Sequence, residues 1–267
     1  MATVPVTLEV LQMLEQVPAN ECGALVRQRT DGTMAGALLV EHGRVCWAMS
    51  DRYPRRLTDL LVAESDTLTR EQINEVFALC RRDRVPLGET LVARGLVSLP
   101  VLHRVLFRHT CEALDCLLRE DSELWTWVEH SGYGYHPMLT FSTAELLTGI
   151  HALEHPTIAA RALATLGAAL GPEQRGFAIQ RTRDARLPLA QIGCEDLDLV
   201  EFADLATQAN DVMTTASTVA IEVVVAMIGE RACASWVEDD LLFLILCDGE
   251  LAFNRLLAQV ATLTRRP

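Results

Sequence analysis

The sequence predicts an α/β fold of the α+β kind. We expect an N-terminal β-meander with a helical subdomain, followed by a C-terminal five-stranded antiparallel sheet with helices. Short runs of β type stand between longer segments of helical period along the 267 residues. A chain of this length usually forms two domains of about 100 to 150 residues. Pro156 and Gly171-Pro172 interrupt the chain, so the expected domains are 1–150 and 156–267.

A helix and three strands open the chain. Residues 7–16 space their apolar side chains as an amphipathic helix that ends before Pro18. Asp31-Gly32 and His42-Gly43 are turn dipeptides that separate three runs of β type. The predicted strands are 23–29, 36–40 and 44–49.

Residues 55–119 are predicted to be helical and contain a weak internal repeat. One copy starts at Arg56-Leu57-Thr58 and the other at Pro86-Leu87-Gly88-Glu89, and each predicts a short helix, a turn and a second helix. Thr69 and Ser98 are suited to cap the second helices. The last helix, 100–119, is expected to bury six apolar side chains: Leu102, Val105, Leu106, Ala113, Leu114 and Leu117.

Two further strands, 123–129 and 138–142, are expected to complete the first half, joined by a turn at Gly132-Tyr133-Gly134. Trp125 and Trp127 should share one face, because side chains alternate along a strand.

The second half predicts the order α-β-β-α-β-β-β-α. The first helix is 157–170 and the last is 250–264, and the five strands are 176–183, 187–194, 220–228, 231–237 and 241–247. Pro188 restricts the second strand to an edge or to a later start. Between the second and third strands lies a long helix with one continuous apolar seam. Its members are Leu199, Phe202, Ala206, Ala209, Met213 and Ala216.

Composition excludes several classes of function. The net charge is −13, and neither half of the chain is net basic, so nucleic acid is not an expected partner. All 23 basic residues are arginine. Without lysine, a Walker A loop, a pyridoxal Schiff base and a protein kinase site are excluded. This lysine-free composition, rich in Ala and Arg, suggests a bacterial genome of high GC content.

Location and local chemistry follow from simple patterns. The N-terminus has no signal-peptide pattern and no apolar run is long enough to span a membrane, so we expect a cytoplasmic protein.

The eight cysteines form no C-x-x-C pair and are expected to be small buried hydrophobes. Arg52, Arg55 and Arg56 are interpreted as a solvated face, and His103 and His109 as partly exposed helical side chains.

One motif leaves an enzyme as an alternative. His151-Ala152-Leu153-Glu154-His155 spells H-x-x-E-H, in which two histidines one helical turn apart bind zinc and the glutamate is the general base of a zinc hydrolase. Pro156 disfavours a helical conformation at His155. The other interpretation is a helix end with two solvated histidines.

The element order of 156–264 resembles the roadblock/dynein light chain family. The resemblance rests on this order, the long helix, the run 241–247 and the acidic turn Glu238-Asp239-Asp240. The family's modules bind or regulate Ras-like GTPases, so the resemblance implies an interaction role without catalytic residues.

Residues 6–145 resemble the PatA-type N-terminal (PATAN) domain of bacterial regulators. The resemblance rests on the N-terminal helix, the runs 23–26, 36–40 and 43–48, and Leu87-Gly88-Glu89. It implies protein–protein regulation rather than chemistry.

Leu87-Gly88-Glu89 is also similar to the N-terminal domain of type II secretion ATPases, which can bind cyclic di-GMP. That motif opens with Arg and closes with Gln, whereas Pro86 and His109 stand here. The other copy keeps Arg56 but has Thr58 in place of Gly. Despite these differences, the similarity leaves a cyclic di-GMP-responsive regulator as an alternative function.

The roadblock resemblance implies that strand 220–228 lies at a sheet edge. The run has strong β propensity and a single charge, without the Lys or Pro that normally protects an edge. We expect two copies to join sheets through this strand while their long helices pack in a two-fold contact. The expected interface residues are Leu199, Phe202, Ala206, Ala209, Met213, Ile221, Val223, Val224, Val225 and Met227.

The sequence therefore predicts a bacterial, non-enzymatic signalling adaptor that forms a homodimer and binds a small Ras-like GTPase. No catalytic residue, metal or cofactor is expected.

Overall fold

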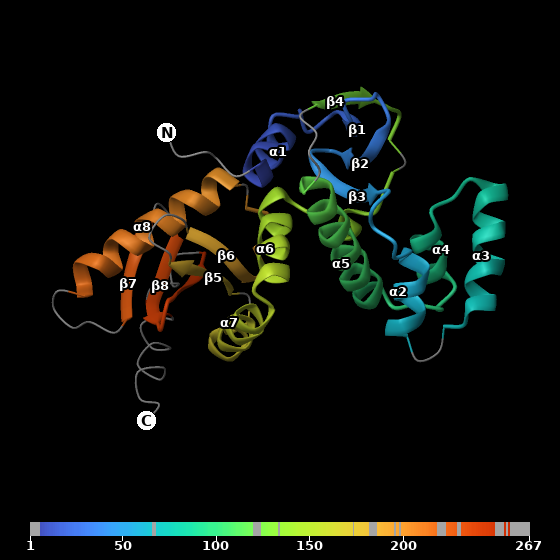
Figure 1. Ribbon diagram of the computed structural model, residues 1–267. Helices are drawn as coiled ribbons and strands as arrows, with labels where there is room; N and C mark the ends of the chain where they lie inside the picture. The colour runs from blue at the N-terminus through green and yellow to red at the C-terminus, as the bar shows by residue number, and fades with distance from the viewer. Residues whose placement is uncertain are drawn as a thin grey trace. The chain divides into compact units, whose positions relative to one another are not determined.

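The computed structural model (Figure 1) describes residues 6–65, 68–119, 124–132, 134–172, 174–181, 186–194, 196–197, 199–217, 223–228, 231–248, 254 and 256. Its internal contacts divide the chain into two compact units, Met1–Leu146 and Leu147–Pro267. Both units combine an antiparallel sheet with helices, so the predicted fold class is confirmed. Among the described helices, none is both long and apolar enough to span a membrane.

Unit 1 contains a four-stranded antiparallel sheet in the order β3-β2-β1-β4. Helix α1 (Val6–Glu15) precedes the sheet, as predicted. The three strands of the predicted meander are β1 (Cys22–Gln28), β2 (Met34–Glu41) and β3 (Arg44–Ser50). The fourth, β4 (Leu124–Glu129), returns from the far end of the unit to pair with β1. Trp125 and Trp127 share its half-buried face, as the alternation predicted.

Four helices separate β3 from β4 in the chain: α2 (Leu57–Glu64), α3 (Arg70–Asp83), α4 (Leu87–Ala93) and α5 (Leu99–Leu118). Helix α5 packs against β2 and β3 and buries all six predicted side chains. Arg27 of β1 is 2% exposed and donates from Nη1 to the carbonyl of Leu117 at 2.7 Å. This hydrogen bond satisfies one of the carbonyls that the end of α5 leaves without a helical partner.

The two predicted helix caps differ. Thr69 accepts from the amide of Gln72, and the Gln72 side chain accepts from the amide of Thr69, which completes a capping box. Ser98 stands at the N-cap position of α5, as predicted, but its side chain makes no capping hydrogen bond there. Pro100 at the second helical position removes one of the two amides that such a cap binds.

The strand predicted at 138–142 is wrong. A 3₁₀ turn, η1 (Pro137–Leu139), stands there, and Phe141 forms only an isolated bridge with Val45. Pro137 fixes its own φ, and His136 Nδ1 accepts from the amide of Met138 at 3.1 Å, so the chain turns here. Tyr133, in the middle of the predicted turn, lies outside the described residues.

Helix α6 (Thr143–Glu154) follows Phe141 and includes the division between the units. Ser142 and Glu145 cap its start reciprocally. Ser142 Oγ accepts from the amide of Glu145 at 3.2 Å, and Glu145 Oε2 accepts from the amide of Ser142 at 2.7 Å. Arg44 of β3 also donates to Glu145 Oε2, at 2.9 Å, so the start of α6 is fastened to the sheet of unit 1.

Unit 2 contains the predicted five-stranded antiparallel sheet, in the order β6-β5-β9-β8-β7. Its strands are β5 (Arg175–Arg181), β6 (Arg186–Ile192), β7 (Val223–Ile228), β8 (Arg231–Glu238) and β9 (Leu241–Cys247). Helices α7 (Pro156–Ala169) and α8 (Leu199–Ser217) also belong to this unit. Of the predicted final helix, 250–264, only Asn254 and Leu256 belong to the described residues, and the stretch 220–222 lies outside them.

The central strand β9 is buried along its whole length, as its uninterrupted apolar sequence indicated. Helix α7 packs against β5 and β6, and α8 packs against β7 and β8 (Figure 1). Trp236 of β8 stacks on Phe243 of β9 with ring centroids 5.0 Å apart. Strand β6 lies at a sheet edge, as Pro188 predicted, and its pairing with β5 is irregular near that residue.

Candidate functional site

One edge of the unit 2 sheet is the first candidate site. Strand β7 pairs with β8 on one side and is the last strand in the sheet order, so the predicted edge position is confirmed. The outward-facing backbone amides and carbonyls of such a strand are available to another strand. Residues 223–226 are half-buried, and Met227 is 54% exposed.

The predicted interface residues occupy different environments. Ala206, Ala209 and Met213 on α8 are at most 3% exposed, because the helix packs against the sheet of its own chain. The side chains of Leu199 and Phe202 and the whole of Ile221 lie outside the described residues.

Within β7, Val223, Val224 and Val225 are half-buried. Val225 packs against a buried cluster that includes Ala232, Ala234 and Ile245. Met227, by contrast, is accessible. The buried residues of α8 thus pack against the sheet of their own chain and support the edge strand. Strand β7 presents its backbone groups and the Met227 side chain to a partner.

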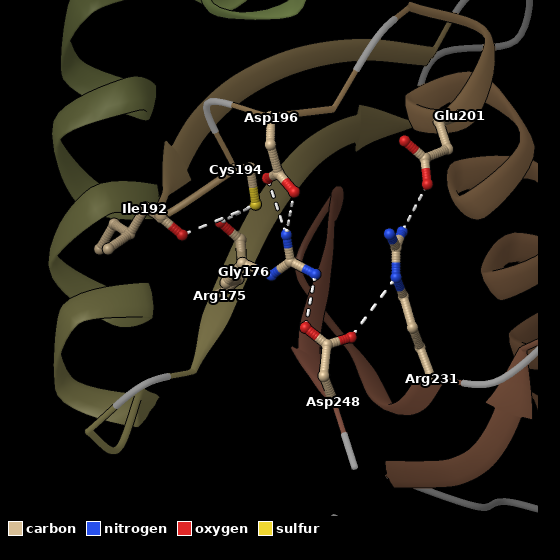
Figure 2. A network of polar contacts seen from close by, with 8 residues as sticks. All are labelled: Arg175, Gly176, Ile192, Cys194, Asp196, Glu201, Arg231 and Asp248. Carbon is tan, nitrogen blue, oxygen red and sulfur yellow. Dashed lines mark hydrogen bonds and ion pairs between the residues drawn. The ribbon is translucent and has the colours of Figure 1, made fainter. Parts of the chain in front are cut away.

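A network of ion pairs lies at one end of the same sheet (Figure 2). Arg175, at the start of β5, contacts both carboxylate oxygens of Asp196 at 2.7 Å. Its second terminal nitrogen donates to Asp248 at 2.8 Å. Arg231, at the start of β8, lies 3.5 Å from Asp248 and donates to Glu201 in the first turn of α8 at 2.7 Å.

The network fastens the start of α8 to three strands of the sheet. Asp248 directly follows β9 and contacts both arginines, so one carboxylate links β9 to β5 and β8, and the Arg231–Glu201 pair extends this link to α8. Cys194 is buried beside the network, and its thiol lies 3.6 Å from the carbonyls of Gly176 and Ile192. The arrangement positions the helix that supports β7.

The acidic turn on which the roadblock resemblance rests joins β8 to β9. Asp239 adopts a left-handed conformation with φ 54°, which asparagine and aspartate tolerate better than most residues. Its carboxylate accepts from Arg161 of α7 at 2.9 Å. Both side chains are more than half exposed, so the pair contributes little to stability.

The residues of the H-x-x-E-H motif do not share one helix. His151 and Glu154 belong to α6, whereas His155 has φ −127° and stands at the start of α7, as Pro156 predicted. In the part of the chain that the structure describes, no group of three side chains is arranged to hold a metal ion. His151 was expected to be solvated, but burial lowers its pKa.

The eight cysteines were expected to be small buried hydrophobes; six are buried, Cys22 and Cys116 are half-buried, and none forms a disulfide. Burial raises the pKa of Cys233 to about 11 and the pKa of Cys46 to about 12. Both are therefore protonated at neutral pH, and a protonated thiol is a poor nucleophile.

A second candidate site is a cavity of about 710 Å³ in unit 1, whose residues sequence reasoning considered only in part, through the cyclic di-GMP alternative. Residues 56–58 of one repeat copy and 86–89 of the other line it together. Arg55 and Arg56 are exposed, as expected, but both face this cavity. His109 also lines it and is 4% exposed rather than partly exposed. The repeat was the signal that pointed to this site.

Comparison with known proteins finds no family model, no curated protein and no solved structure that matches the chain. A functional proposal therefore depends on the geometry of the two candidate sites and on the resemblances in the sequence.

Proposed function

We propose that the protein is a bacterial, non-enzymatic signalling adaptor that dimerises through β7 and binds or regulates a small Ras-like GTPase through unit 2. The observation that carries the proposal is the position of β7 at a sheet edge. Its six residues, Val-Val-Val-Ala-Met-Ile, contain no charge and no proline. Such an edge pairs readily with another strand.

A second copy of the same strand is a suitable occupant. Two β7 strands that pair antiparallel make a self-complementary two-fold contact, because each residue of one copy meets the equivalent part of the other. Backbone hydrogen bonds provide the affinity of such a contact, and side chains on alternate positions provide its specificity. Met227 adds apolar surface that is exposed in the single chain.

The GTPase-binding part of the proposal is supported by the roadblock resemblance of unit 2. Binding needs a surface and no nucleophile, and an activator can stimulate GTP hydrolysis by positioning the partner's own residues. Beside β7, α8 exposes a polar face with Asp204, Thr207, Gln208 and Asp211. This face is suited to a polar, transient partner rather than to permanent burial.

The test of the GTPase proposal starts with crosslinking in extract of the source bacterium, followed by mass spectrometry. A recovered Ras-like GTPase would then be purified, loaded with GTP or GDP, and titrated into the full chain by calorimetry. We expect saturable binding that residues 1–155 alone do not show. If no Ras-like GTPase is recovered, or if the purified one fails to bind, the GTPase part is wrong and the dimerisation part remains to be judged by itself.

Met227→Glu tests whether the exposed edge is the contact surface. The substitution places a charge on β7 without disturbing a buried side chain, so it should weaken dimerisation while leaving the melting temperature of the monomer nearly unchanged. Met34→Glu is the matched control, because Met34 is 50% exposed on a strand of unit 1. Equal effects of the two substitutions on sedimentation would count against β7.

A further inference from the structure

The cavity in unit 1 has the size of a small-molecule site. Its volume of about 710 Å³ falls within the range of about 300 to 1,000 Å³ that is usual for ligand sites. Residues of β2, β3, α2, α3, α4, α5 and η1 and of the loops beside them line it. All these elements belong to unit 1, so the cavity does not depend on how the two units are arranged.

An aromatic wall forms one side of the cavity. The ring of Trp47 stacks on that of His109 with centroids 4.3 Å apart and planes 21° apart. Tyr53 meets the same imidazole edge-on at 5.0 Å. All three residues line the cavity, and flat π faces of this kind are surfaces on which planar rings stack.

A buried polar atom at this wall has no partner. His109 is 4% exposed, and its Nδ1 has no hydrogen-bond partner in the part of the chain that the structure describes. Burial lowers the pKa of His109, so the ring is neutral at pH 7. Leaving a buried polar atom unpaired costs about 1–3 kcal/mol, and such atoms are typical of sites that a bound molecule completes.

The charges around the cavity are opposite in sign to those of the chain as a whole. Arg55, Arg56 and Arg70 line the cavity, and among the described lining residues only Glu89 is acidic. The whole chain carries a net charge of −13. The Glu89 carboxylate is already engaged, because it accepts from the amide of His136 at 2.8 Å. The cavity therefore favours an anion.

The three arginines differ in how far they are already neutralised. Arg70 forms an ion pair with Asp59, and Arg55 lies 4.0 Å from Glu112. Among the described residues, Arg56 has no ion-pair partner. Its guanidinium is thus the group with most capacity to bind a phosphate or a carboxylate.

Apolar surface is also left open at the cavity. Met49 is 43% exposed and Phe77 is 47% exposed, and both line the cavity. Large apolar side chains exposed together beside a cavity are usual where a ligand covers them.

We propose that this cavity binds a planar aromatic anion, a ring system that bears a phosphate or a carboxylate group. The ring lies against the Trp47–His109 wall, and the anionic group lies at Arg56. The proposal concerns unit 1 and stands independently of dimerisation and GTPase binding by unit 2.

A matched series of naphthalene compounds tests the proposal by calorimetry on the full chain. The probes are 1-naphthyl phosphate, 1-naphthoate, neutral 1-naphthol, cationic 1-naphthylmethylamine and inorganic phosphate. We expect at least one naphthyl anion to bind about tenfold more tightly than 1-naphthol, and the amine and inorganic phosphate to bind more weakly still. Tighter binding of the phosphate would indicate phosphate esters as the natural ligand class, and tighter binding of the carboxylate would indicate aromatic acids.

Arg56→Ala should weaken binding of the preferred anion by about tenfold and leave the binding of 1-naphthol unchanged. Arg81→Ala is the matched control, since Arg81 is exposed on α3 and does not line the cavity. Arg56→Lys, which keeps the charge, should give an intermediate affinity and guards against a folding defect in the alanine variant. The proposal is overturned if no probe binds, if 1-naphthol binds as tightly as both anions, or if Arg56→Ala and Arg81→Ala have equal effects.

Discussion

The sheets of the two units protect their edges differently. In unit 1, Phe141 pairs with the edge strand β3 and covers part of its edge. Phe141 and Val45 exchange two backbone hydrogen bonds of 2.9 and 2.8 Å. In unit 2, the edge strand β6 carries Pro188, which cannot donate to another strand. Strand β7 has neither protection among its six residues.

The other edge strand of unit 1, β4, is intermediate. It exposes Leu124 and Val128 but ends in the charged Glu129. Proteins normally protect edges with charges, prolines or covering segments, because a bare edge recruits other strands. Among the described edge strands, β7 has the fewest of these protections, and this difference supports the proposal that a second chain covers it.

The largest expected effect tests whether the two sheets are separate folding units. A Cβ at Gly36 of β2 would lie 2.1 Å from the carbonyl oxygen of Met49, on the neighbouring strand. Gly36→Ala should therefore destabilise unit 1 by about 3 kcal/mol. Calorimetry should show the transition of unit 1 at a lower temperature and that of unit 2 unchanged. A single transition that shifts as a whole would mean that the units fold together.

The same change in the other sheet gives the reciprocal test. A Cβ at Gly176 of β5 would lie 2.7 Å from the carbonyl oxygen of Leu244. Because this overlap is smaller, Gly176→Ala should cost about 2 kcal/mol and act on unit 2 alone. Gly167→Ala is the control, since nothing lies within 4 Å of its Cβ position in α7. Destabilisation by the control would show that the glycine argument fails.

Helix caps sharpen the comparison within unit 1. Thr69→Ala should destabilise this unit by about 1 kcal/mol, because it removes the capping box of α3. Ser98→Ala should have almost no effect, since Ser98 makes no side-chain hydrogen bond at the start of α5. Denaturant unfolding of the two variants measures the difference. Equal losses would contradict the assignment of the caps.

The smallest effect concerns the ion-pair network of unit 2. Asp248→Asn removes the charge that links Arg175 to Arg231 and should cost about 0.5 kcal/mol at low ionic strength. Asp239→Asn, in an isolated exposed pair with Arg161, should cost less. The difference should shrink in high salt. If it does not, charge pairing is not what fastens α8 to the sheet.

Periodicity predicted most of the fold, because the elements that it describes are stabilised by their own apolar faces. The seam of α8 and the buried run of β9 are visible in the sequence for this reason. Helix α6 was missed although its capping box, Ser142 to Glu145, is a local signal. The apparent strand at 138–142 was wrong because Pro137 and His136 favour a turn.

The two candidate sites differ in how much of each could be predicted. The edge strand is one continuous run, so its residues were identified from sequence, and only its position in the sheet required the structure. The cavity brings Arg56 together with Trp47 and His109, which lie far apart in the chain. No local pattern encodes the stacking of Trp47 on His109, because it depends on how α5 packs against β3.

The measurement that tests the central claim most directly is light scattering on the native chain and on Val223→Pro and Val224→Pro. On an edge strand, alternate residues direct their amides toward β8 and toward solvent. One proline should therefore break the pairing with β8, and the other should remove only an outward donor. We predict a dimer for the native chain at micromolar concentration and a folded monomer for one of the two variants. A native chain that stays monomeric at high concentration, or a folded dimer for both variants, would contradict dimerisation through β7.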